Sequence, residues 1–153
     1  MTEDDTTATV EIVIRAARVF AAVTAESIAR AEPGVTLPQL RVLTVASEVG
    51  VLCNADVART LDIHISNASR LCERLVQAGL LDRRDSPTDR RQVELRLTDA
   101  GRDLVASVTE HRRTAFTSIL AGMSRAERES LHDSLQAFTR SGEHRIGSAL
   151  AGP

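Results

Sequence analysis

The sequence predicts a mainly α-helical protein with one small β-hairpin, arranged as a winged helix-turn-helix between terminal helices. Three observations predict this fold class. Apolar residues recur at helical spacing over most of the chain, two short helices with a brief turn between them lie near its centre, and residues 92–97 alternate polar and apolar side chains soon afterwards. With 153 residues, of which 42% are hydrophobic, the chain is large enough to form a core.

The chain is expected to begin with a long helix and to turn sharply after it. Apolar residues over 10–31 recur on one helical face, and Pro33-Gly34 breaks that helix. Thr36 and Gln39 then have the Thr-x-x-Gln form of a capping box, with a proline in the first turn. These residues predict the start of a second helix.

The second helix should end at Gly50, and two shorter helices should follow it. Residues 51–53 can form a short extended piece, and Asn54 is a good N-cap for the third helix. A tight break at residues 62–64 precedes the fourth helix, which is expected over residues 66–78. Two short helices joined by a brief turn are typical of a helix-turn-helix.

The fourth helix has two chemically different faces. Its core face is apolar and is made by Ala68, Leu71, Cys72 and Leu75. Its opposite face is polar and is made by Ser66, Arg70, Glu73, Arg74 and Gln77. A helix that is anchored in a core by one face and polar on the other is suited to lie in a DNA groove.

After the fourth helix, the spacing of apolar residues changes from helical to alternating, and this change predicts the β-hairpin. Residues 92–97 alternate strictly between polar and apolar side chains, which is typical of a half-buried strand. Residues 80–84 can pair with them across a turn at residues 85–89. The fourth helix and this hairpin together predict a winged helix.

Two further helices are expected after the hairpin. Thr98 can cap a long helix, which Gly122 closes. Ser124 and Glu127 belong to another capping box, which opens the last helix. The predicted winged helix is thus flanked by one long helix before it and two helices after it.

All three aromatic residues of the chain lie on the terminal helices. They are Phe20, Phe116 and Phe138. We therefore expect the first helix and the last two helices to share a hydrophobic cluster that is separate from the core of the winged helix. A single chain would leave much of the faces of these long helices uncovered, so the sequence predicts a homodimer in which two chains pack them together.

This pattern divides the chain into three parts. We expect residues 1–8 to form a flexible acidic N-terminus, residues 9–32 and 99–150 to form a helical dimerisation lobe, and residues 34–98 to form a winged helix-turn-helix DNA-binding lobe. Two-fold symmetry would then present two copies of the fourth helix roughly 34 Å apart, the spacing of successive major grooves.

The distribution of charge is more informative than its sum. The formal net charge is −2, which alone argues against a nucleic-acid partner because counterion release needs a basic surface. Residues 64–96, however, hold seven arginines against five acids, and all nineteen basic residues of the chain are arginines. This local surplus indicates double-stranded DNA as the partner of the segment.

Several other classes of protein find no support in the sequence. The first residues are acidic and no apolar run approaches membrane-spanning length, so we expect a cytoplasmic protein that does not contact a membrane. Cys53 and Cys72 form neither a CxxC pair nor a disulfide framework, and the four histidines lack metal-ligand spacing. Without a Ser/His/Asp arrangement, a phosphate loop or an HExxH motif, neither an enzyme nor a bound cofactor is expected.

The hairpin and its exit resemble the MarR family of bacterial transcriptional regulators. The family signature DxRxxxxxLT and the glycine that follows it are matched by Asp89, Arg91, Leu97, Thr98 and Gly101. The resemblance is most specific over residues 61–101, and the helix order is similar over nearly the whole chain. It implies a dimeric winged-helix protein, usually a repressor, whose fourth helix enters the major groove and whose wing arginine enters the adjacent minor groove.

The resemblance also implies a small-molecule effector. In many members of the family a small, often aromatic or phenolic ligand binds between the two lobes and alters the spacing of the DNA-reading heads. Because this chain has no Trp or Tyr and three Phe, its pocket should be mainly aliphatic, with a histidine or an arginine to orient an acid. The sequence assigns no particular residue to this ligand.

The candidate DNA contacts lie on two helices and on the wing. Arg91 matches the wing arginine, whose guanidinium a narrow minor groove attracts. Asp89 is expected to accept hydrogen bonds from a nearby arginine and support the wing, and Arg90 to contact either a phosphate or solvent. Thr36 and Gln39 offer the start of the second helix to a phosphate. The candidates on the fourth helix are Ser66, Asn67, Ser69, Arg70 and Arg74, with Arg70 the leading one.

A second interpretation is a winged-helix module that binds only other proteins. Wings and recognition helices can serve as interaction surfaces without touching DNA. The seven arginines of residues 64–96 weigh against this interpretation, because a protein-binding surface has no need of such a cluster.

Overall fold

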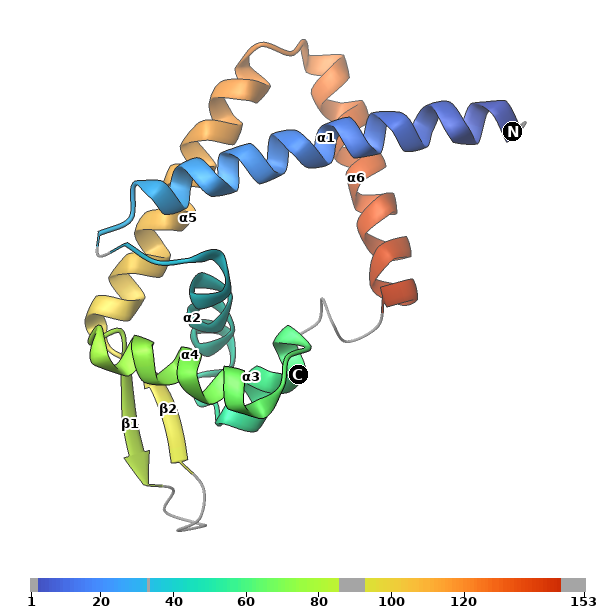
Figure 1. Cartoon of the computed structure of the whole chain (residues 1–153). Coiled ribbons are helices and arrows are strands. Elements are labelled where there is room, and N and C mark those ends of the chain that lie inside the picture. The colour runs from blue at the N-terminus through green and yellow to red at the C-terminus, as the bar shows by residue number, and fades with distance from the viewer. Residues whose placement is uncertain (1–2, 33, 86–92, 147–153) are drawn as a thin grey trace.

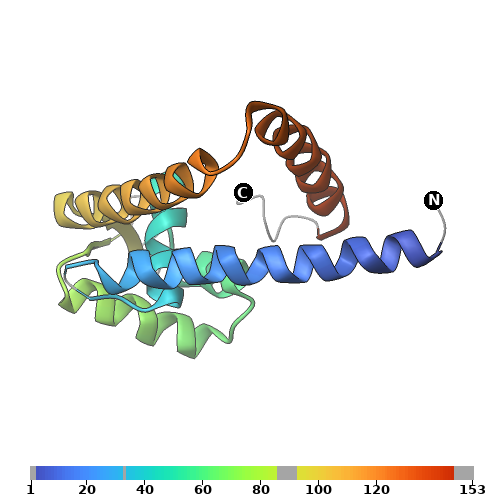
Figure 2. The same ribbon diagram turned by 90° about the horizontal axis from the view of Figure 1, so that it is seen from above.

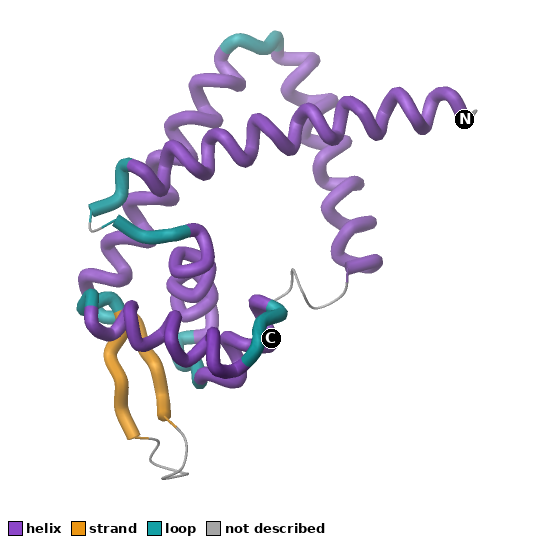
Figure 3. The backbone as a smooth tube through the Cα atoms, in the orientation of Figure 1, coloured by secondary structure: helices purple, strands orange, loops and turns teal. Residues whose placement is uncertain are grey.

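The computed structural model describes residues 3–32, 34–85 and 93–146, and these form a mainly helical structure with one β-hairpin (Figures 1 and 3). In chain order, the elements are α1 (Glu3–Ala29), α2 (Leu37–Val49), α3 (Asn54–Leu61), α4 (Ile65–Gln77), β1 (Leu81–Asp85), β2 (Val93–Leu97), α5 (Asp99–Ala121) and α6 (Arg125–Ile146). The predicted fold class is confirmed, since α2 to β2 form a winged helix-turn-helix between terminal helices.

Helix α1 is longer than its apolar periodicity predicts. It begins at Glu3, so residues 3–8, which we expected to precede the helix as a flexible acidic segment, form its first turns. The apolar pattern begins only at Val10 and therefore gives no signal for these turns.

Three helix starts are capped as the sequence predicts. The backbone N–H of Thr36 donates to Oε1 of Gln39 at 2.8 Å, which forms half of the capping box of α2. The Thr98 hydroxyl accepts a hydrogen bond from a backbone N–H in the first turn of α5. The N–H of Ser124 donates to Oε2 of Glu127 at 2.7 Å at the start of α6. Local side-chain chemistry therefore sets these boundaries.

The prediction of Asn54 as the N-cap of α3 is wrong by one residue. The helix begins at Asn54, and Cys53 occupies the N-cap position. Oδ2 of Asp56 accepts a hydrogen bond from the Cys53 N–H at 2.9 Å, so the capping carboxylate comes from inside the helix. Oδ1 of Asn54 is buried and has no hydrogen-bond partner among the described residues.

The hairpin pairs antiparallel, and β1 begins one residue later than predicted. Leu81 lies opposite Leu97 at the open end of the hairpin. The predicted extended piece at residues 51–53 joins this pair, because Leu52 donates to the carbonyl oxygen of Leu95 at 3.0 Å and accepts from its N–H at 2.7 Å. The wing is therefore tied to the segment that precedes α3.

The core lies within the winged helix-turn-helix, between α2, α3, α4, the hairpin and the first half of α5. Burial of a leucine or valine side chain contributes about 1.5–3 kcal/mol each to folding. This packing fixes the position of α4. The largest fully buried side chains of the cluster are Val42, Leu43, Cys72, Leu75, Leu80, Leu81 and Val108.

A close approach joins α5 to the end of α4. A Cβ atom at Gly101 would lie 2.2 Å from the carbonyl oxygen of Leu80 and 2.9 Å from Cδ2 of Leu97, so only glycine fits there. The Thr98 hydroxyl donates to the carbonyl oxygen of Gly79 at 2.6 Å and accepts from the N–H of Gly101 at 3.0 Å. The Leu-Thr and glycine of the sequence motif thus form the junction between the winged helix and α5.

The terminal helices pack less completely. The rings of Phe20 on α1 and Phe116 on α5 lie 5.5 Å apart, and Ser27 of α1 is 2% exposed. Phe138 of α6 is 57% exposed, so the expected cluster of three phenylalanines contains two of them in the single chain. Figures 1 and 2 show α6 and the N-terminal half of α1 extending beyond the winged helix, and no described side chain of α6 is buried.

Candidate nucleic-acid interface

Helix α4 is anchored by one face and exposed on the other. Ala68, Cys72 and Leu75 are at most 2% exposed and pack into the core. Four of the predicted contacts lie outside this core face and are exposed, namely Ser66, Asn67, Arg70 and Arg74. The fifth, Ser69, is half-buried. The arrangement presents a polar helical surface on a rigid support.

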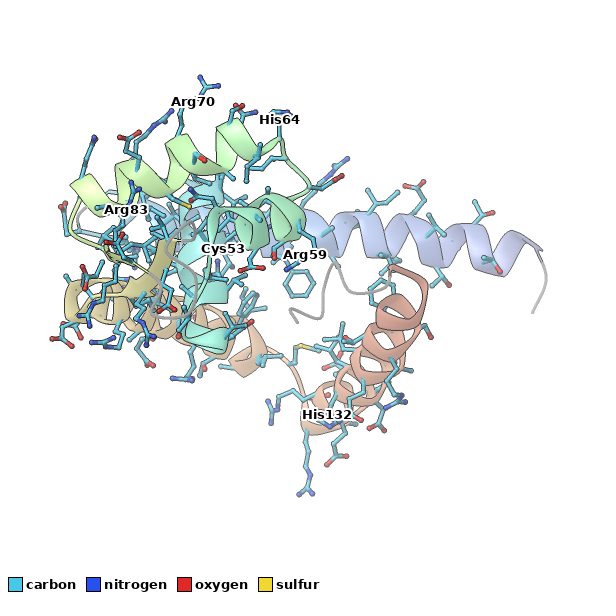
Figure 4. The ribbon with its side chains drawn as sticks, turned by 90° about the horizontal axis from the view of Figure 1, so that it is seen from below. Cys53, Arg59, His64, Arg70, Arg83 and His132 are labelled. Atoms are coloured by element: carbon cyan, nitrogen blue, oxygen red, sulfur yellow. The ribbon has the colours of Figure 1, made fainter. Side chains whose placement is uncertain are left out.

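Hydrogen bonds hold Arg70 against the first turn of α4. Its Nε donates to the carbonyl oxygen of Ser66 at 3.3 Å, and its Nη2 donates to Oδ1 of Asn67 at 3.1 Å. Figure 4 shows the Arg70 side chain at the outer edge of the molecule, pointing away from the ribbon. Three of the predicted contacts therefore form one connected group whose remaining guanidinium donors face outward.

The N-cap of α4 is a residue that the sequence rules did not single out. His64 has an extended backbone, and its Nδ1 accepts a hydrogen bond from the N–H of Ser66 at 3.3 Å. Nδ1 also lies 2.9 Å from the Ser66 hydroxyl. Histidine is not among the residues favoured at N-caps, so residue preference does not predict this cap. The position of His64 directly before a polar-faced helix is the signal that could have identified it.

The arginines on the hairpin strands are partly neutralised. Nε of Arg84 lies 2.7 Å from Oδ2 of Asp82, and Nη2 of Arg96 lies 3.0 Å from Oε2 of Glu94. Arg83 is exposed on β1 and is labelled in Figure 4. The number of arginines in this segment therefore overstates the positive charge that the strands offer to a phosphate.

The remaining predicted contacts lie elsewhere. Asp89, Arg90 and Arg91 are outside the described residues, between the end of β1 and the start of β2. Thr36 and Gln39 are at the start of α2, where the two side chains bond to each other as a capping box. The structure thus brings together the candidates on α4 and keeps those on α2 on a separate element.

Two ionisable groups near α4 have shifted pKa values. Burial raises the pKa of the Cys72 thiol to about 11, so this residue is an uncharged part of the core at neutral pH. Burial alone would also raise the pKa of Asp56, but its hydrogen bonds from Cys53 and the attraction of Arg59 outweigh burial and hold that pKa below its ordinary value of 3.8. Asp56 therefore caps α3 as a carboxylate.

A cleft of about 330 Å³ lies between α1 and α5. Its walls combine apolar side chains with hydroxyl groups, a histidine and the ion pair of Arg30 with Glu26 at 2.6 Å. Nδ1 of His111 is buried there and has no hydrogen-bond partner among the described residues. The lining residues include Val23, Ser27, Arg30, His111, Thr114 and Ile119.

Two other kinds of site find no support in the described ranges. Within residues 3–32, 34–85 and 93–146, no group of His, Cys, Asp or Glu side chains is placed to hold a metal ion. In the same ranges, no helix has both the length and the apolar character needed to cross a membrane.

The chain is similar to known regulators in sequence and in structure. The model of the MarR family matches residues 35–93. The uncharacterized HTH-type transcriptional regulator YfiV of Bacillus subtilis (strain 168) is 27% identical over 109 residues, which are 71% of this chain and 68% of YfiV. The HTH-type transcriptional repressor IacR of Pseudomonas putida is 25% identical over 100 residues, which are 65% of this chain and 60% of IacR.

A solved structure extends the similarity over nearly the whole chain. The crystal structure of RV1404 from Mycobacterium tuberculosis is 39% identical in sequence and superimposes with a TM-score of 0.84. The match covers 93% of this chain and 95% of RV1404, so it includes the terminal helices as well as the winged helix.

Proposed function

Because this chain belongs to the MarR family of transcriptional regulators, we propose that it is a repressor that binds a pseudo-palindromic operator as a homodimer. The observation that carries this proposal is the polar face of α4, which is exposed opposite a buried face and carries Arg70 braced on its first turn. The name of the related IacR supports repression as the mode of action.

In this proposal, α4 enters the major groove and Arg70 is its leading contact. The guanidinium is held by neutral acceptors, so its charge is not cancelled, and its free donors can reach a guanine edge or a phosphate. Ser66, Asn67, Ser69 and Arg74 supply further contacts to base edges or phosphates. Buried Ala68, Cys72 and Leu75 on the opposite face support the rigid placement that base reading needs.

The wing supplies the second set of contacts with the duplex. Arg91 enters the adjacent minor groove, Asp89 accepts hydrogen bonds that support the wing, and Arg90 contacts a phosphate. Thr36 and Gln39 present the first turn of α2 to the DNA backbone. Arg84 and Arg96 on the strands are already paired with acids, which favours Arg91 over these two arginines as a cation that contacts DNA.

Exposed apolar side chains on the terminal helices support the homodimer. Ile12 and Val19 of α1, Ile119 of α5 and Leu135 and Phe138 of α6 are between 39% and 59% exposed. A surface of this kind on three long helices is better explained by a second chain than by solvent. Pairing through these helices would leave both copies of α4 free to face the DNA.

An effector is proposed for the cleft between α1 and α5. Its walls are more polar than the mainly aliphatic pocket expected from the sequence, and they offer His111 and several hydroxyl groups to an acid beside the ion pair of Arg30 with Glu26. Nδ1 of His111, which has no partner in the described part of the chain, would gain a hydrogen-bond partner in a bound aromatic or phenolic ligand. Because α1 and α5 both lead into the winged helix, a change in their separation would move α4.

The test is a titration of the full chain against the promoter region beside its own gene, at salt concentrations from 50 to 200 mM. A regulator that contacts several phosphates should bind tightly, prefer this duplex to a scrambled one of the same composition, and weaken by more than about tenfold over this range. Failure to bind either duplex would overturn the proposal and favour a winged-helix module that binds only proteins.

A further inference from the structure

His64 is both the cap of a helix and exposed to solvent. It is the N-cap of α4, where its Nδ1 faces the N–H of Ser66 at 3.3 Å and the hydroxyl of Ser66 at 2.9 Å. It is also exposed, directly before the helix whose first turn carries the candidate DNA contacts. One edge of the ring is therefore used inside the protein and the other is available outside it.

The capping bond determines which ring nitrogen carries the proton. A backbone N–H can only donate, so Nδ1 must present a lone pair to the N–H of Ser66. In the neutral imidazole the proton then resides on Nε2, because each tautomer has one donor nitrogen and one acceptor nitrogen. The cap thus makes Nε2 of His64 a hydrogen-bond donor.

His64 is connected to Arg70 through Ser66. Ser66 joins the two side chains, since its N–H and hydroxyl meet His64 while its carbonyl oxygen accepts from Nε of Arg70. Figure 4 shows His64 and Arg70 at the same outer edge of α4, both pointing away from the rest of the molecule. The N-terminal half of α4 and its cap therefore present an imidazole donor and a guanidinium at the same outer edge.

We propose that His64 is a DNA-contacting residue, whose Nε2–H donates to an acceptor on the duplex while its Nδ1 keeps the first turn of α4 capped. The proposal rests on the proposed DNA-binding function. The acceptor is an oxygen or nitrogen that carries no proton, which is found both on phosphates and on the major-groove edge of guanine. The capping bond orients the ring before DNA arrives, so little side-chain entropy is lost on contact.

Two substitutions separate the contact from the cap. Serine is a favoured N-cap but is too short to reach the DNA, whereas alanine has neither capability. If His64 contacts DNA, both His64→Ser and His64→Ala should weaken operator binding about three- to tenfold, the loss expected for one hydrogen bond. If His64 is only a cap, His64→Ser should bind like the wild type, and this outcome would overturn the proposal.

The matched control is His132→Ser. His132 is an exposed histidine on α6 that also bonds to a neighbouring side chain, with its Nε2 3.0 Å from Nε2 of Gln136. Figure 4 shows it on a different part of the molecule from α4. Its replacement should leave operator affinity unchanged, and a loss equal to that of His64→Ser would mean that the effect of histidine removal is not local to α4.

Comparing the loss of affinity for the operator with the loss for unrelated DNA shows whether the acceptor is on a phosphate or on a base. A phosphate contact predicts that His64→Ser weakens binding to the operator and to unrelated DNA by the same factor, whereas a base contact predicts a larger loss on the operator. Both outcomes support the proposal. Equal affinities of wild type and His64→Ser on both duplexes overturn it and leave the proposed function intact, provided that the wild type binds its operator.

Nitrogen-15 NMR of the histidine rings tests the tautomer directly. In the free full-length protein, His64 should show an unprotonated Nδ1 and a protonated Nε2, and addition of operator DNA should shift the Nε2 signal more than the Nδ1 signal. A proton on Nδ1, or a ring that does not respond to the operator, would contradict the proposal. A wild-type chain that binds no DNA would overturn both this proposal and the proposed function.

Discussion

At the scale of single residues, the arginines of the proposed DNA-binding surface differ in what they already contact. Arg84 and Arg96 are paired with acids on their own strands at 2.7 and 3.0 Å. Arg70 donates to a carbonyl oxygen and to an amide oxygen, which leave its positive charge uncancelled. We therefore expect affinity for DNA to depend on a few particular arginines and not on their number.

Replacing Arg91 with alanine is expected to weaken operator binding roughly tenfold, because a charge-assisted contact in the minor groove is lost. Fluorescence anisotropy with a labelled operator measures this change. Arg84→Ala is the matched control and should lose less, since the guanidinium of Arg84 is already paired with Asp82. Sedimentation should find the Arg91→Ala variant still dimeric, and monomers would contradict the assignment of the wing and the terminal helices to separate lobes.

Gly101→Ala should lower the free energy of unfolding by about 1–3 kcal/mol, since α5 must move away from the end of α4 to accommodate the methyl group. The added Cβ would lie 2.2 Å from the carbonyl oxygen of Leu80. Urea unfolding followed by circular dichroism measures the loss. Gly142→Ala is the control, because no atom lies within 4 Å of its added Cβ and alanine favours a helix. Equal stability of Gly101→Ala and wild type would refute this close approach.

At the scale of elements, Asp56 links the stability of α3 to pH. Its folded pKa is held below the ordinary value of 3.8, so its contribution is fully present above that value and is lost as the pH falls through the folded pKa. Asp56→Ala should therefore cost about 1 kcal/mol at pH 7 and much less near pH 2, as measured by urea unfolding. The control Arg59→Ala removes the ion pair but keeps the cap, and it should cost less at pH 7. A loss that does not change with pH would contradict the capping role.

Elements whose boundaries depend on residues close together in the sequence could be predicted well. The capping boxes at Thr36 and Ser124 lie within four residues of chain, and the alternation over 92–97 depends on neighbouring side chains alone. The two faces of α4 also follow from helical spacing, so the candidates Ser66, Asn67, Arg70 and Arg74 were found on the exposed side without the structure.

Features that depend on competition between neighbouring groups, or on side-chain geometry, were not predicted. Cys53 caps α3 in place of Asn54 because the carboxylate of Asp56 reaches back to its N–H. His64 was missed because its capping role depends on ring geometry and not on propensity. The salt bridges of Arg84 and Arg96 join each arginine to an acid two residues away on the same face of its own strand, which the charge count of a segment does not reveal.

At the scale of the whole molecule, the terminal helices expose large apolar side chains to solvent. The exposed side chains of α1 and α6 lie on helices that extend beyond the winged helix (Figure 2), and Phe138 of α6 is 57% exposed. A homodimer would bury this surface and would fix the distance between two copies of α4. The predicted spacing of the DNA-reading helices therefore depends on the terminal helices.

Phe138→Glu is expected to shift the chain from dimer to monomer, because a buried unpaired carboxylate is strongly unfavourable at an apolar interface. Analytical ultracentrifugation over a range of protein concentrations measures the shift. Gln136→Glu places the same charge two residues away, on the opposite face of α6, and should leave the dimer intact. Monomers from both variants, or from neither, would argue against an interface on the face that carries Phe138.

The most direct test of the dimeric DNA-binding account is hydroxyl-radical footprinting of the full chain on the promoter region beside its own gene. Two α4 helices held by a homodimer should protect two patches of backbone about 10 base pairs apart, centred on an approximate two-fold axis of the sequence. A single protected patch, or weak protection spread evenly along the duplex, would contradict the account.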